Sequence, residues 1–479
     1  MRRMLRKTRI VATVGPGSSS AEKIKELLLA GVNVFRINFS HGNHQIQSER
    51  IETIRKVSDS LGLNPALLAD LQGPKIRTGK TDGGRSVTLS SGSEVTITSD
   101  DVVCDENLIS VDYPHLVEEI SVGQRIMIND GLIKLEVDEI DKRTNRIHCV
   151  VVDGGVYSSR KGVNLPNVDL SVPSLTEKDR EDIGLIVEND FQYVALSFVR
   201  RGKDIEKLRE IIAPVRPDLK IIAKIEKPEA ADNIEEILGV SDGIMVARGD
   251  LGVEMSPDVV PVVQKDLIRK ANDSGKIVIV ATQMLESMIN HPLPTRAEAA
   301  DVANAIIDDT DAVMLSGETA VGSYAVQSVE TMSRIAFAAE QSEYCSTEII
   351  DFHNSDRYPP HAMAEAAVWA ARDMGGIPIC LYTLSGDTAF YMAKLRNQSP
   401  VYVFSPDIHV VKMLSIAWNV EAFHLSFSEG DQVRMLRSGE EILVRKGILE
   451  SGDTIAVLAG TTPVRGATNI LRIKKVFEV

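Results

Sequence analysis

Cysteine is scarce in this chain of 479 residues, which contains only four, at positions 104, 149, 345 and 380, and no CxxC pair. This scarcity argues against a disulfide framework and against a cysteine-based zinc site. Long apolar runs are also missing, since none approaches the ~18 residues that a membrane-spanning helix requires. The basic and then apolar start is broken by Gly15-Pro16-Gly17, which predicts a first β-strand rather than a signal peptide. We therefore expect a location in the reducing cytoplasm, with no membrane contact.

The chain also lacks an excess of positive charge. The formal net charge is −15 and the pI is near 5.2, whereas nucleic-acid and anionic-membrane binders need a basic surface. Local basic pockets for phosphorylated metabolites remain compatible with this balance. The hydrophobic share of 43% and the charged share of 25% are typical of a soluble globular protein. A chain of this length is expected to form roughly two to four domains.

The first two thirds of the chain, apart from residues 72–166, consist mainly of short apolar runs. Each run is followed by a helix-like segment. There are eight, at residues 9–16, 33–40, 65–71, 193–198, 220–226, 242–250, 277–284 and 312–320. Strands that alternate with helices in this number predict a (β/α)₈ TIM barrel. After Pro294, Thr295 and Glu298 have the spacing of a capping box, which predicts the start of a helix.

Two segments depart from this rhythm. Residues 72–166 contain β-forming stretches between glycine turns, which predicts an inserted all-β domain, a β-barrel, after the third strand. In residues 345–479, β-runs again alternate with helices, which predicts a C-terminal open α/β domain. The catalytic barrel domain is then formed by residues 1–71 and 167–344.

Polar residues gather where the barrel strands are expected to end, which is where TIM barrels place their catalytic groups. Arg36, Asn38 and Ser40 are spaced by two at the end of the second strand, so they are expected to share one face. A ring of polar residues on separate strands predicts one active site. The other members are Asp70 on the third strand, Lys224 and Glu226 on the fifth, Asp250 on the sixth, Thr282 and Gln283 on the seventh, and Ser316 and Glu318 on the eighth.

The residue types in this ring narrow the chemistry. Glu226 and Asp250 provide hard oxygen ligands suited to Mg²⁺ or Mn²⁺. Arg36, Arg77 and Lys224 are cations suited to phosphate oxygens and to a phosphoryl group in transfer. Because neither a Ser–His pair nor a His–Cys cluster accompanies them, metal-assisted phosphoryl transfer or enolate chemistry is favoured. For Lys224 and Glu226 alone, a structural ion pair at the barrel rim is the alternative.

Several long motifs indicate a family. They are NFSHG (38–42), DLQGPKIRTG (70–79), RKGVNLP (160–166), AKIEKPE (223–229), MVARGDLGVE (245–254), ATQMLESM (281–288), PTRAEAADVANAIID (294–308) and AVMLSGETA (312–320). In this order, and over essentially the whole chain, they resemble pyruvate kinase. The resemblance implies a glycolytic enzyme that transfers the phosphoryl group of phosphoenolpyruvate to ADP, giving pyruvate and ATP.

The resemblance also implies roles for individual residues. Lys224 would stabilise the phosphoryl group in flight, while Glu226 and Asp250 would bind the divalent ion. The amides of Gly249 and Asp250, with the Thr282 hydroxyl, would hold the substrate carboxylate. Thr282 and Ser316 are candidates for the relay that protonates the enolate, and the donor itself stays open. Contacts with phosphate and nucleotide are implied for Arg36, Asn38, His41, Arg77 and Lys161, the last when the β-domain closes as a lid.

One departure from many family members concerns a monovalent cation. Many pyruvate kinases hold K⁺ with Asn, Ser, Asp and a Thr carbonyl, and Asn38, Ser40 and Asp70 match that set. Leu71 and Lys75, however, stand where those enzymes have Thr and Glu, and this pattern resembles the K⁺-independent branch. A tethered ammonium at Lys75 would supply the charge of the diffusible ion, so we expect activity without K⁺.

The C-terminal domain contains a weaker ligand signal. TLSGDTA (383–389) places hydroxyls and a glycine at an expected helix N-terminus, where backbone amides favour phosphate. In the family such a loop often binds a sugar-phosphate or nucleotide activator, which implicates Thr383, Ser385 and Thr388. Asp387 stands where a basic residue is usual, and a plain helix cap is an equal alternative. The resemblance further implies a homotetramer.

Two other functions compete with this interpretation. A metal-dependent aldolase or lyase of 2-oxo acid chemistry would share Glu226 and Asp250 but would have no use for a lid or for Lys161. A non-enzymatic sensor of phosphorylated metabolites would have the same pockets, yet no expected catalytic residue is missing. A pyruvate assay coupled to lactate dehydrogenase, with ADP and Mg²⁺ varied, separates the three.

Overall fold

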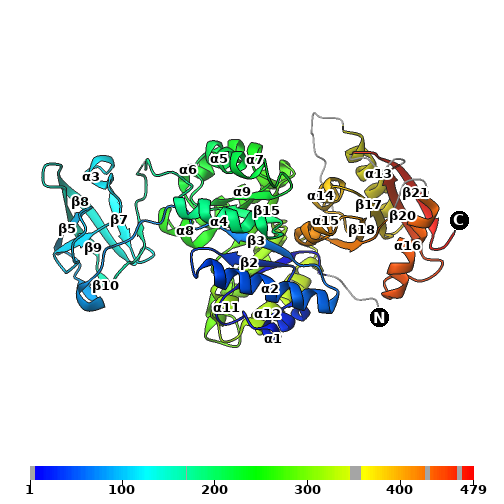
Figure 1. Ribbon diagram of the computed structural model, residues 1–479, viewed down its shortest axis with the longest axis horizontal. Helices are drawn as coiled ribbons and strands as arrows, with labels where there is room; N and C mark the ends of the chain where they lie inside the picture. The colour runs from blue at the N-terminus through cyan, green and yellow to red at the C-terminus, as the bar shows by residue number, and fades with distance from the viewer. Residues whose placement is uncertain (1–5, 169, 346–357, 427–431, 461–465, 479) are drawn as a thin grey trace.

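Three bodies lie in a row in the computed structural model, with a barrel between an inserted β-domain and a C-terminal α/β domain (Figure 1). The structure describes residues 6–168, 170–345, 358–426, 432–460 and 466–478. The predicted start of the C-terminal domain at residue 345 borders a segment, 346–357, that lies outside the described residues.

Eight strands form a closed barrel in the order β1-β16-β15-β14-β13-β12-β3-β2, and all neighbours are parallel. This confirms the predicted TIM barrel. The strands are β1 (Arg9–Val14), β2 (Val34–Asn38), β3 (Ala66–Asp70), β12 (Tyr193–Leu196), β13 (Lys220–Ile225), β14 (Gly243–Ala247), β15 (Ile277–Ala281) and β16 (Ala312–Leu315).

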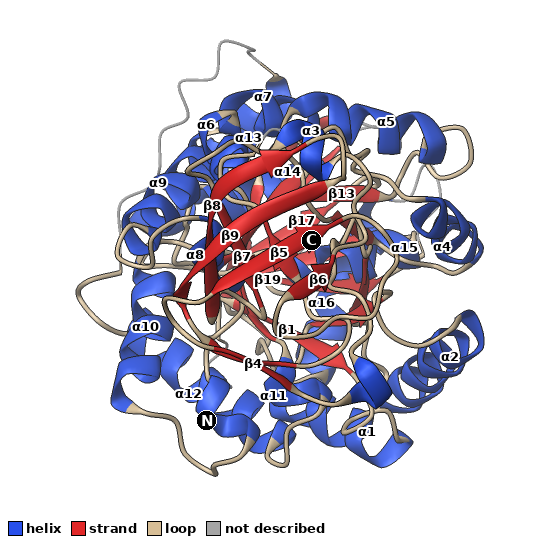
Figure 2. Cartoon of the chain, turned by 90° about the vertical axis from the view of Figure 1, so that its left-hand side faces the viewer, coloured by secondary structure: helices blue, strands red, loops and turns tan. Residues whose placement is uncertain are grey.

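Helices surround these strands, as the view from the inserted domain shows (Figure 2). The predicted capping box is present at α10, where the Thr295 hydroxyl accepts a hydrogen bond from the Glu298 N–H at 3.2 Å. The long helices are α1 (Ala21–Ala30), α2 (His44–Leu61), α4 (Glu177–Glu188), α5 (Gly202–Ile212), α9 (Val260–Asp273), α10 (Arg296–Ile307) and α12 (Ala325–Glu340). Shorter ones are α6 (Pro228–Asp232), α7 (Ile234–Val240), α8 (Arg248–Glu254) and α11 (Gly317–Ala320).

Alternate residues of each barrel strand enter two different apolar clusters, because successive side chains of a strand point to opposite faces. Ile10 and Ala12 of β1 pack with helix residues such as Leu27, whereas Val11 packs with residues of other strands such as Val34. The strands are therefore buried on both faces, as parallel strands usually are, and polar groups are left to their ends.

The inserted segment begins beyond the carboxyl end of β3, and its strands form two sheets, which confirms its predicted all-β character; closure into a β-barrel stays a prediction. One sheet has the order β11-β7-β8-β9-β5-β6, and the other is the pair β10-β4. The chain leaves the first sheet at Gly154, where an added Cβ would lie 2.4 Å from the Leu89 carbonyl oxygen. The elements are β4 (Val87–Leu89), β5 (Glu94–Thr98), β6 (Leu108–Ser110), α3 (Leu116–Glu119), β7 (Arg125–Ile128), β8 (Ile133–Asp141), β9 (Arg146–Asp153), β10 (Gly155–Tyr157) and β11 (Val163–Asn164).

The C-terminal domain is an open sheet of order β19-β18-β17-β20-β21, and only its last strand is antiparallel. It packs at the amino ends of the barrel strands, where Arg9 at the start of β1 donates to the Ala417 carbonyl at 2.7 Å. None of the described helices is long and apolar enough to cross a membrane. The elements are α13 (Pro359–Asp373), β17 (Ile379–Tyr382), α14 (Asp387–Lys394), β18 (Val401–Ser405), α15 (Ile408–Met413), β19 (Val420–His424), α16 (Gln432–Arg445), β20 (Thr454–Gly460) and β21 (Thr468–Lys475).

Candidate active site

Lys224 lies at the centre of the polar ring. Its Nζ atom is 2.7 Å from Glu226 Oε1, 3.3 Å from Asp70 Oδ1 and 2.8 Å from the Ser197 hydroxyl. The side chain is 11% exposed, so the ammonium is nearly enclosed but reachable from the barrel mouth. Three successive strands, β3, β12 and β13, thus bring one cation, two carboxylates and one hydroxyl together.

Arg36 shares the Asp70 carboxylate with Lys224. Its Nε atom lies 2.6 Å from Asp70 Oδ2, and its Nη1 atom donates to the Thr13 hydroxyl at 3.0 Å. Burial alone would raise the pKa of Asp70, but Arg36 and Lys224 together lower it below its ordinary value. Asp70 therefore remains a carboxylate that orients both cations.

The same charges set the protonation of Lys224 and Glu226. Burial would lower the pKa of the Lys224 ammonium, but Asp70 and Glu226 more than reverse this effect and raise it. Burial raises the pKa of Glu226, and the nearby Asp250 raises it further against the opposing effect of Lys224. Lys224 is therefore a permanent cation. Any additional positive charge near Glu226 would stabilise its ionised form.

Ser40 and Asp250 are two of the predicted strand-end residues that lie beyond the end of their strand. Ser40 is not on β2, which ends at Asn38; it lies in the following turn, where its N–H donates to Asn38 Oδ1 at 3.0 Å. Asp250 does not close β14 but lies exposed in the first turn of α8, because the helix begins at Arg248 directly after the strand. Both residues remain at the carboxyl end of the barrel.

Thr282 follows β15 in an unusual backbone conformation. Its φ is +67° and that of Gln283 is +53°, a left-handed region that costs a side-chain-bearing residue about 1–2 kcal/mol. The Thr282 hydroxyl donates to the Ala281 carbonyl at 2.6 Å and accepts the Gly249 N–H at 2.7 Å. An added Cβ at Gly249 would lie 3.3 Å from that hydroxyl oxygen, so glycine permits this approach. The Gly249 amide that we assigned to substrate is thus bonded to Thr282 in this structure.

Ser316 and Glu318 follow β16. The Ser316 hydroxyl oxygen is buried and has no hydrogen-bond partner among the described residues. The Glu318 carboxylate accepts the N–H groups of Ser316 at 2.8 Å and Leu285 at 3.0 Å, and burial raises its pKa. Glu318 therefore joins the seventh and eighth strand ends, and Ser316 retains a free hydroxyl there.

The predicted nucleotide and monovalent-cation residues lie on the rim toward the inserted domain. His41 is exposed, and partial burial together with the cations Lys75, Arg36 and Arg77 lowers its pKa. Partial burial and repulsion by Lys224 lower the pKa of Lys75, and Asp250, Glu226 and Asp70 act against them. Lys75 is exposed on this rim, and the charges of the central carboxylates act on it there.

Leu71, Arg77 and Lys161 complete this group. Leu71 is fully buried, and its carbonyl accepts the Ser197 hydroxyl at 2.7 Å. Arg77 pairs with Gly162 as an isolated β-bridge, and the Lys161 N–H donates to the Thr78 hydroxyl at 2.9 Å. The structure thus brings Arg77 and Lys161 together where the chain enters and leaves the inserted domain.

The predicted effector loop does precede a helix. Gly386, at φ +83°, caps α14, and the Gly386 N–H donates to the Thr383 hydroxyl at 3.1 Å. Ser385 donates to Asp387 Oδ2 at 2.7 Å, and Thr388 lies 3.5 Å from the Thr468 hydroxyl. Gly386 caps α14 without a side-chain hydrogen bond, so the helix-cap and effector interpretations both stay predictions.

Three site residues escaped the sequence analysis. Ser197 and Phe198 follow β12; the hydroxyl of Ser197 contacts Lys224, and the N–H of Phe198 donates to Glu226 Oε2 at 2.8 Å. Their position after the fourth apolar run was the available signal. Arg248 contacts the carbonyl oxygens of Thr282 and Gln283, for which the sequence offered no local signal.

The carboxylates suit a divalent ion. Among the described residues no group of three His, Cys, Asp or Glu side chains is placed to hold a metal. Glu226 and Asp250 would therefore supply two ligands and leave the other positions to water and substrate. This is the manner in which Mg²⁺ is usually bound beside phosphate groups.

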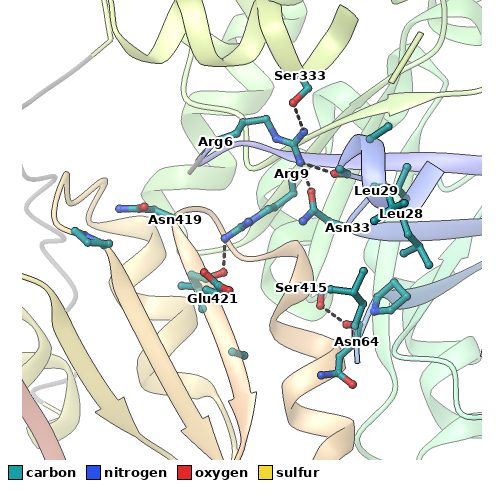
Figure 3. Close-up of a pocket in the computed structure, with 18 of the residues that line it drawn as sticks. Arg6, Arg9, Leu28, Leu29, Asn33, Asn64, Ser333, Ser415, Asn419 and Glu421 are labelled. Atoms are coloured by element: carbon teal, nitrogen blue, oxygen red, sulfur yellow. Dashed lines mark hydrogen bonds between the residues drawn. The ribbon is translucent and has the colours of Figure 1, made fainter. Parts of the chain in front are cut away.

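A large cavity of about 1070 Å³ lies at the other end of the barrel, between the amino ends of the strands and the C-terminal domain (Figure 3). Arg6 donates there to the Ser333 hydroxyl at 3.0 Å and to the Gly31 carbonyl at 2.7 Å. Burial lowers the pKa of Arg6 to about 9 and that of Arg9 to about 10. No predicted site residue lines this cavity, so it is separate from the polar ring.

Comparison with known proteins agrees with the geometry. The family models "Pyruvate kinase, barrel domain" and "Pyruvate kinase, alpha/beta domain" match residues 5–329 and 361–474. The chain is 42% identical to a pyruvate kinase of Geobacillus stearothermophilus and 42% identical to one of Staphylococcus aureus; each match covers 99% of this chain and 81% of the relative.

A solved structure of a pyruvate kinase from Cryptosporidium parvum covers 98% of this chain and 96% of its own, with 34% identity and a TM-score of 0.91. These matches favour the predicted kinase over the aldolase and sensor alternatives. The chain therefore belongs to the pyruvate kinase family and is an enzyme of that class, with phosphoenolpyruvate and ADP as substrates and pyruvate and ATP as products.

Proposed function

We propose that the polar ring performs phosphoryl transfer with the residue roles that the motifs imply. The observation that supports this most is the position of the Lys224 ammonium, 2.7 Å from Glu226 and 3.3 Å from Asp70. Two carboxylates hold the nearly enclosed Lys224 ammonium in place before substrate binds. A cation fixed in this way can stabilise the negative charge that develops on the phosphoryl group in the transition state. Lys224 stabilises the phosphoryl group as it passes between the two oxygens.

Glu226 and Asp250 bind the divalent cation, which family members require, and we propose Mg²⁺ with Mn²⁺ as a substitute. When bound, this ion neutralises substrate and phosphate oxygens as a Lewis acid. Arg36 binds the phosphate of phosphoenolpyruvate. Asn38, His41, Arg77 and Lys161 face the nucleotide, with residues 72–166 acting as the lid that brings Lys161 to it.

In the reaction, the bond between phosphorus and the enol oxygen breaks while a β-phosphate oxygen of ADP bonds to phosphorus. The bonding electron pair stays on the enol oxygen, which leaves an enolate. The methylene carbon then takes a proton, and the product is pyruvate. Thr282 and Ser316 form the relay for this proton, and the buried Ser316 hydroxyl, which has no hydrogen-bond partner in the described part of the chain, supports that role.

Metal ligation is tested by a readout other than turnover. Mutation of a residue that hydrogen-bonds a metal ligand lowers metal affinity by roughly 10–100-fold. Mutation of the ligand itself should lower it at least as much. We expect Glu226→Gln and Asp250→Asn to weaken Mn²⁺ binding accordingly, as measured by electron paramagnetic resonance. Glu229→Gln, on the neighbouring helix α6, is the control and should keep the wild-type affinity. Unchanged Mn²⁺ affinity in Glu226→Gln would contradict the assignment.

K⁺ independence is a separate part of the proposal. Lys75 lies within the electrostatic range of Asp250, Glu226 and Asp70, so its ammonium replaces the monovalent ion that Asn38, Ser40 and Leu71 would otherwise help to hold. We expect full activity in tetramethylammonium buffer. Lys75→Glu should then need added K⁺. A strict K⁺ requirement of the unaltered enzyme would refute this part.

Three further properties belong to the proposal. The enzyme acts in the cytoplasm as a homotetramer. A sugar-phosphate or nucleotide activator binds the loop of Thr383, Ser385 and Thr388, whose hydroxyls lie at the start of α14. Titration of sugar phosphates and AMP against phosphoenolpyruvate saturation tests the activator, and an unchanged saturation curve with every compound would exclude it.

A further inference from the structure

The turn after β15 is held in a conformation that its own residues disfavour. Thr282 and Gln283 both have positive φ, and Thr282 is β-branched, which makes it a genuine outlier in this region. Such a conformation persists only where the surrounding structure enforces it. The question is therefore which contacts enforce it.

Arg248 provides these contacts. Its Nη2 atom donates to the Thr282 carbonyl at 2.9 Å and to the Gln283 carbonyl at 3.1 Å, and its Nε atom lies 3.3 Å from the Thr282 carbonyl. The side chain is only 9% exposed. One planar guanidinium thus bonds both carbonyls of the strained pair, which a flexible ammonium could not do in the same way.

Two further helices fix the guanidinium from its other edge. Its Nη1 atom lies 2.6 Å from Asp301 Oδ2 on α10 and 3.4 Å from Gln264 Oε1 on α9. The Asp301 carboxylate also neutralises the Arg248 guanidinium, whose other partners are uncharged. The guanidinium plane is therefore set by α9 and α10 together with the turn.

The backbone next to Arg248 contacts the same threonine. The Gly249 N–H donates to the Thr282 hydroxyl at 2.7 Å, and Asp250 follows directly in the first turn of α8. Residues 248–250 therefore hold Thr282 at both its carbonyl and its hydroxyl. They also link its position to that of the Asp250 carboxylate.

We infer that Arg248 is a positioning residue for the protonation of the enolate. Its guanidinium, oriented by Asp301, holds Thr282 in the left-handed conformation from which the Thr282 hydroxyl serves the proposed proton relay. This inference rests on the role proposed for Thr282. Arg248 acts through Thr282 and touches no substrate.

Kinetics of Arg248 and Asp301 variants test the inference. A displacement of catalytic groups by about 1 Å can cost on the order of 100-fold. We expect about that loss of kcat in Arg248→Met, with KM for phosphoenolpyruvate changed less than about threefold. Arg248→Lys should lose less, on the order of tenfold, because one ammonium reaches one carbonyl. Asp301→Asn should lose the least, because the carbonyl contacts remain.

Arg209→Met is the matched control. Arg209 also bonds an aspartate and a backbone carbonyl, Asp242 at 2.8 Å and Val240 at 3.1 Å, but at the opposite end of β14. We expect it to keep wild-type kcat. Thermal midpoints of all variants show whether they are folded. Guanidinium ions added to Arg248→Ala should restore part of kcat, which a purely structural role would not predict.

A double-mutant cycle separates this inference from the role of Thr282. The inference predicts that Arg248→Met slows the wild-type enzyme but not Thr282→Ala, because groups that act as a unit are not additive. Uptake of solvent deuterium into the methyl group of pyruvate, with ATP and Mg²⁺ present, should fall in parallel. Normal turnover of Thr282→Ala would remove the proposed role of Thr282 and this inference with it. A slow Thr282→Ala beside a normal or fully additive Arg248→Met would overturn the inference alone.

Discussion

The two ends of the barrel use similar charged residues in opposite ways. At the carboxyl end, Lys224 and Arg36 share Asp70 at the mouth, and each cationic side chain is 11% exposed. At the amino end, Lys394 and Arg396 share Asp311 between the barrel and the C-terminal domain, and none of these side chains is more than 3% exposed. The first cluster is open toward ligands, and the second is closed by a neighbouring domain.

The difference shows how catalytic charges can be told from structural ones. The open end also contains the exposed Asp250, the unpartnered Ser316 hydroxyl and the strained Thr282. At the closed end, Lys394 and Arg396 both also bond the Asn272 side chain, at 2.9 and 3.1 Å. Local strain and unpaired buried atoms occur at the closed end too, where Asp309 and Arg396 have positive φ and Arg396 Nε has no hydrogen-bond partner among the described residues. Exposure to ligands, and not local strain, therefore distinguishes the two ends.

The largest expected effect breaks the closed cluster. Asp311→Asn leaves Lys394 and Arg396 buried with Asp309, 4.0 Å from Arg396, as the remaining carboxylate. Removal of one partner of a buried ion pair costs about 3–5 kcal/mol, so we expect a loss of that size in the free energy of unfolding. Urea unfolding measures it, and kcat of the folded enzyme should not change. Asp266→Asn on α9, an exposed pair, should cost less than about 1 kcal/mol.

The next effect breaks the open cluster. Lys224→Met removes a preorganised charge and should reduce kcat by about 10²–10³-fold. The thermal midpoint should fall as well, because the buried Asp70 and Glu226 carboxylates lose their shared cation, so kcat is measured on the folded enzyme. Near-normal turnover of this variant would contradict the role of Lys224. A large loss of stability without loss of kcat would make the two barrel ends equivalent.

A smaller effect is expected from the hydrogen bond between Ser197 and Lys224 at the open end. Ser197 donates to the Leu71 carbonyl and accepts from Lys224, so Ser197→Ala leaves the ammonium with one fewer partner. A hydrogen bond to a charged group is worth about 1.5–3 kcal/mol, and we expect kcat to fall about tenfold or more. Ser99→Ala in the inserted domain is the control. An unchanged kcat in Ser197→Ala would show that Ser197 only packs beside Lys224.

The smallest effect concerns acid stability at the closed end. Asp190 lies 2.8 Å from both His409 and Lys412 of α15. Burial would raise the pKa of Asp190, but these two bonds lower it to about 2 from 3.8. The stabilisation is complete above about pH 5 and is lost as the pH falls through 3.8 toward 2. The Asp190 side chain is 36% exposed, so solvent screens these ion pairs. We therefore expect them to contribute about 1 kcal/mol to the free energy of unfolding.

Comparison of wild type with Asp190→Asn measures this contribution. The difference in unfolding free energy between the two proteins should shrink as the pH falls from 4 to 2. Asp153→Asn, which removes an exposed partner of Lys134 in the inserted domain, should show no such change. A difference that is constant over this range would exclude the titration of Asp190 as its cause.

Much of the fold and of the site was predictable because the relevant patterns are local. Apolar runs and helical periodicity gave the correct number of barrel strands, and the long motifs gave the family. The predicted position of Asp250 on a strand was wrong because the strand-to-helix change at Arg248 leaves no turn residues between them. The all-β insertion was likewise predictable, because its β-forming stretches lie between glycine turns, whereas its division into a six-stranded sheet and the pair β10-β4 depends on strand pairing.

The contacts of Ser197 and Arg248 could not be predicted from any local pattern. Ser197 is 27 residues from Lys224, and Arg248 is 34 residues from Thr282. Nor does the sequence indicate a positive φ at Thr282, because glycine, asparagine and aspartate are the residues that usually adopt it. These features depend on which strand ends become neighbours.

By itself, the sequence determined the alternation of strands and helices, the family, and the placement of charged residues at one end of the barrel, because these follow from periodicity and short-range chemistry. Only the tertiary structure decided which charges meet, which stay open and which are closed off. Closure of β1 against β16 brings distant strand ends within hydrogen-bond reach, and docking of the C-terminal domain buries the charges at the other end. Hydrogen bonds and burial act over a few ångströms in space, not over a few positions in the chain.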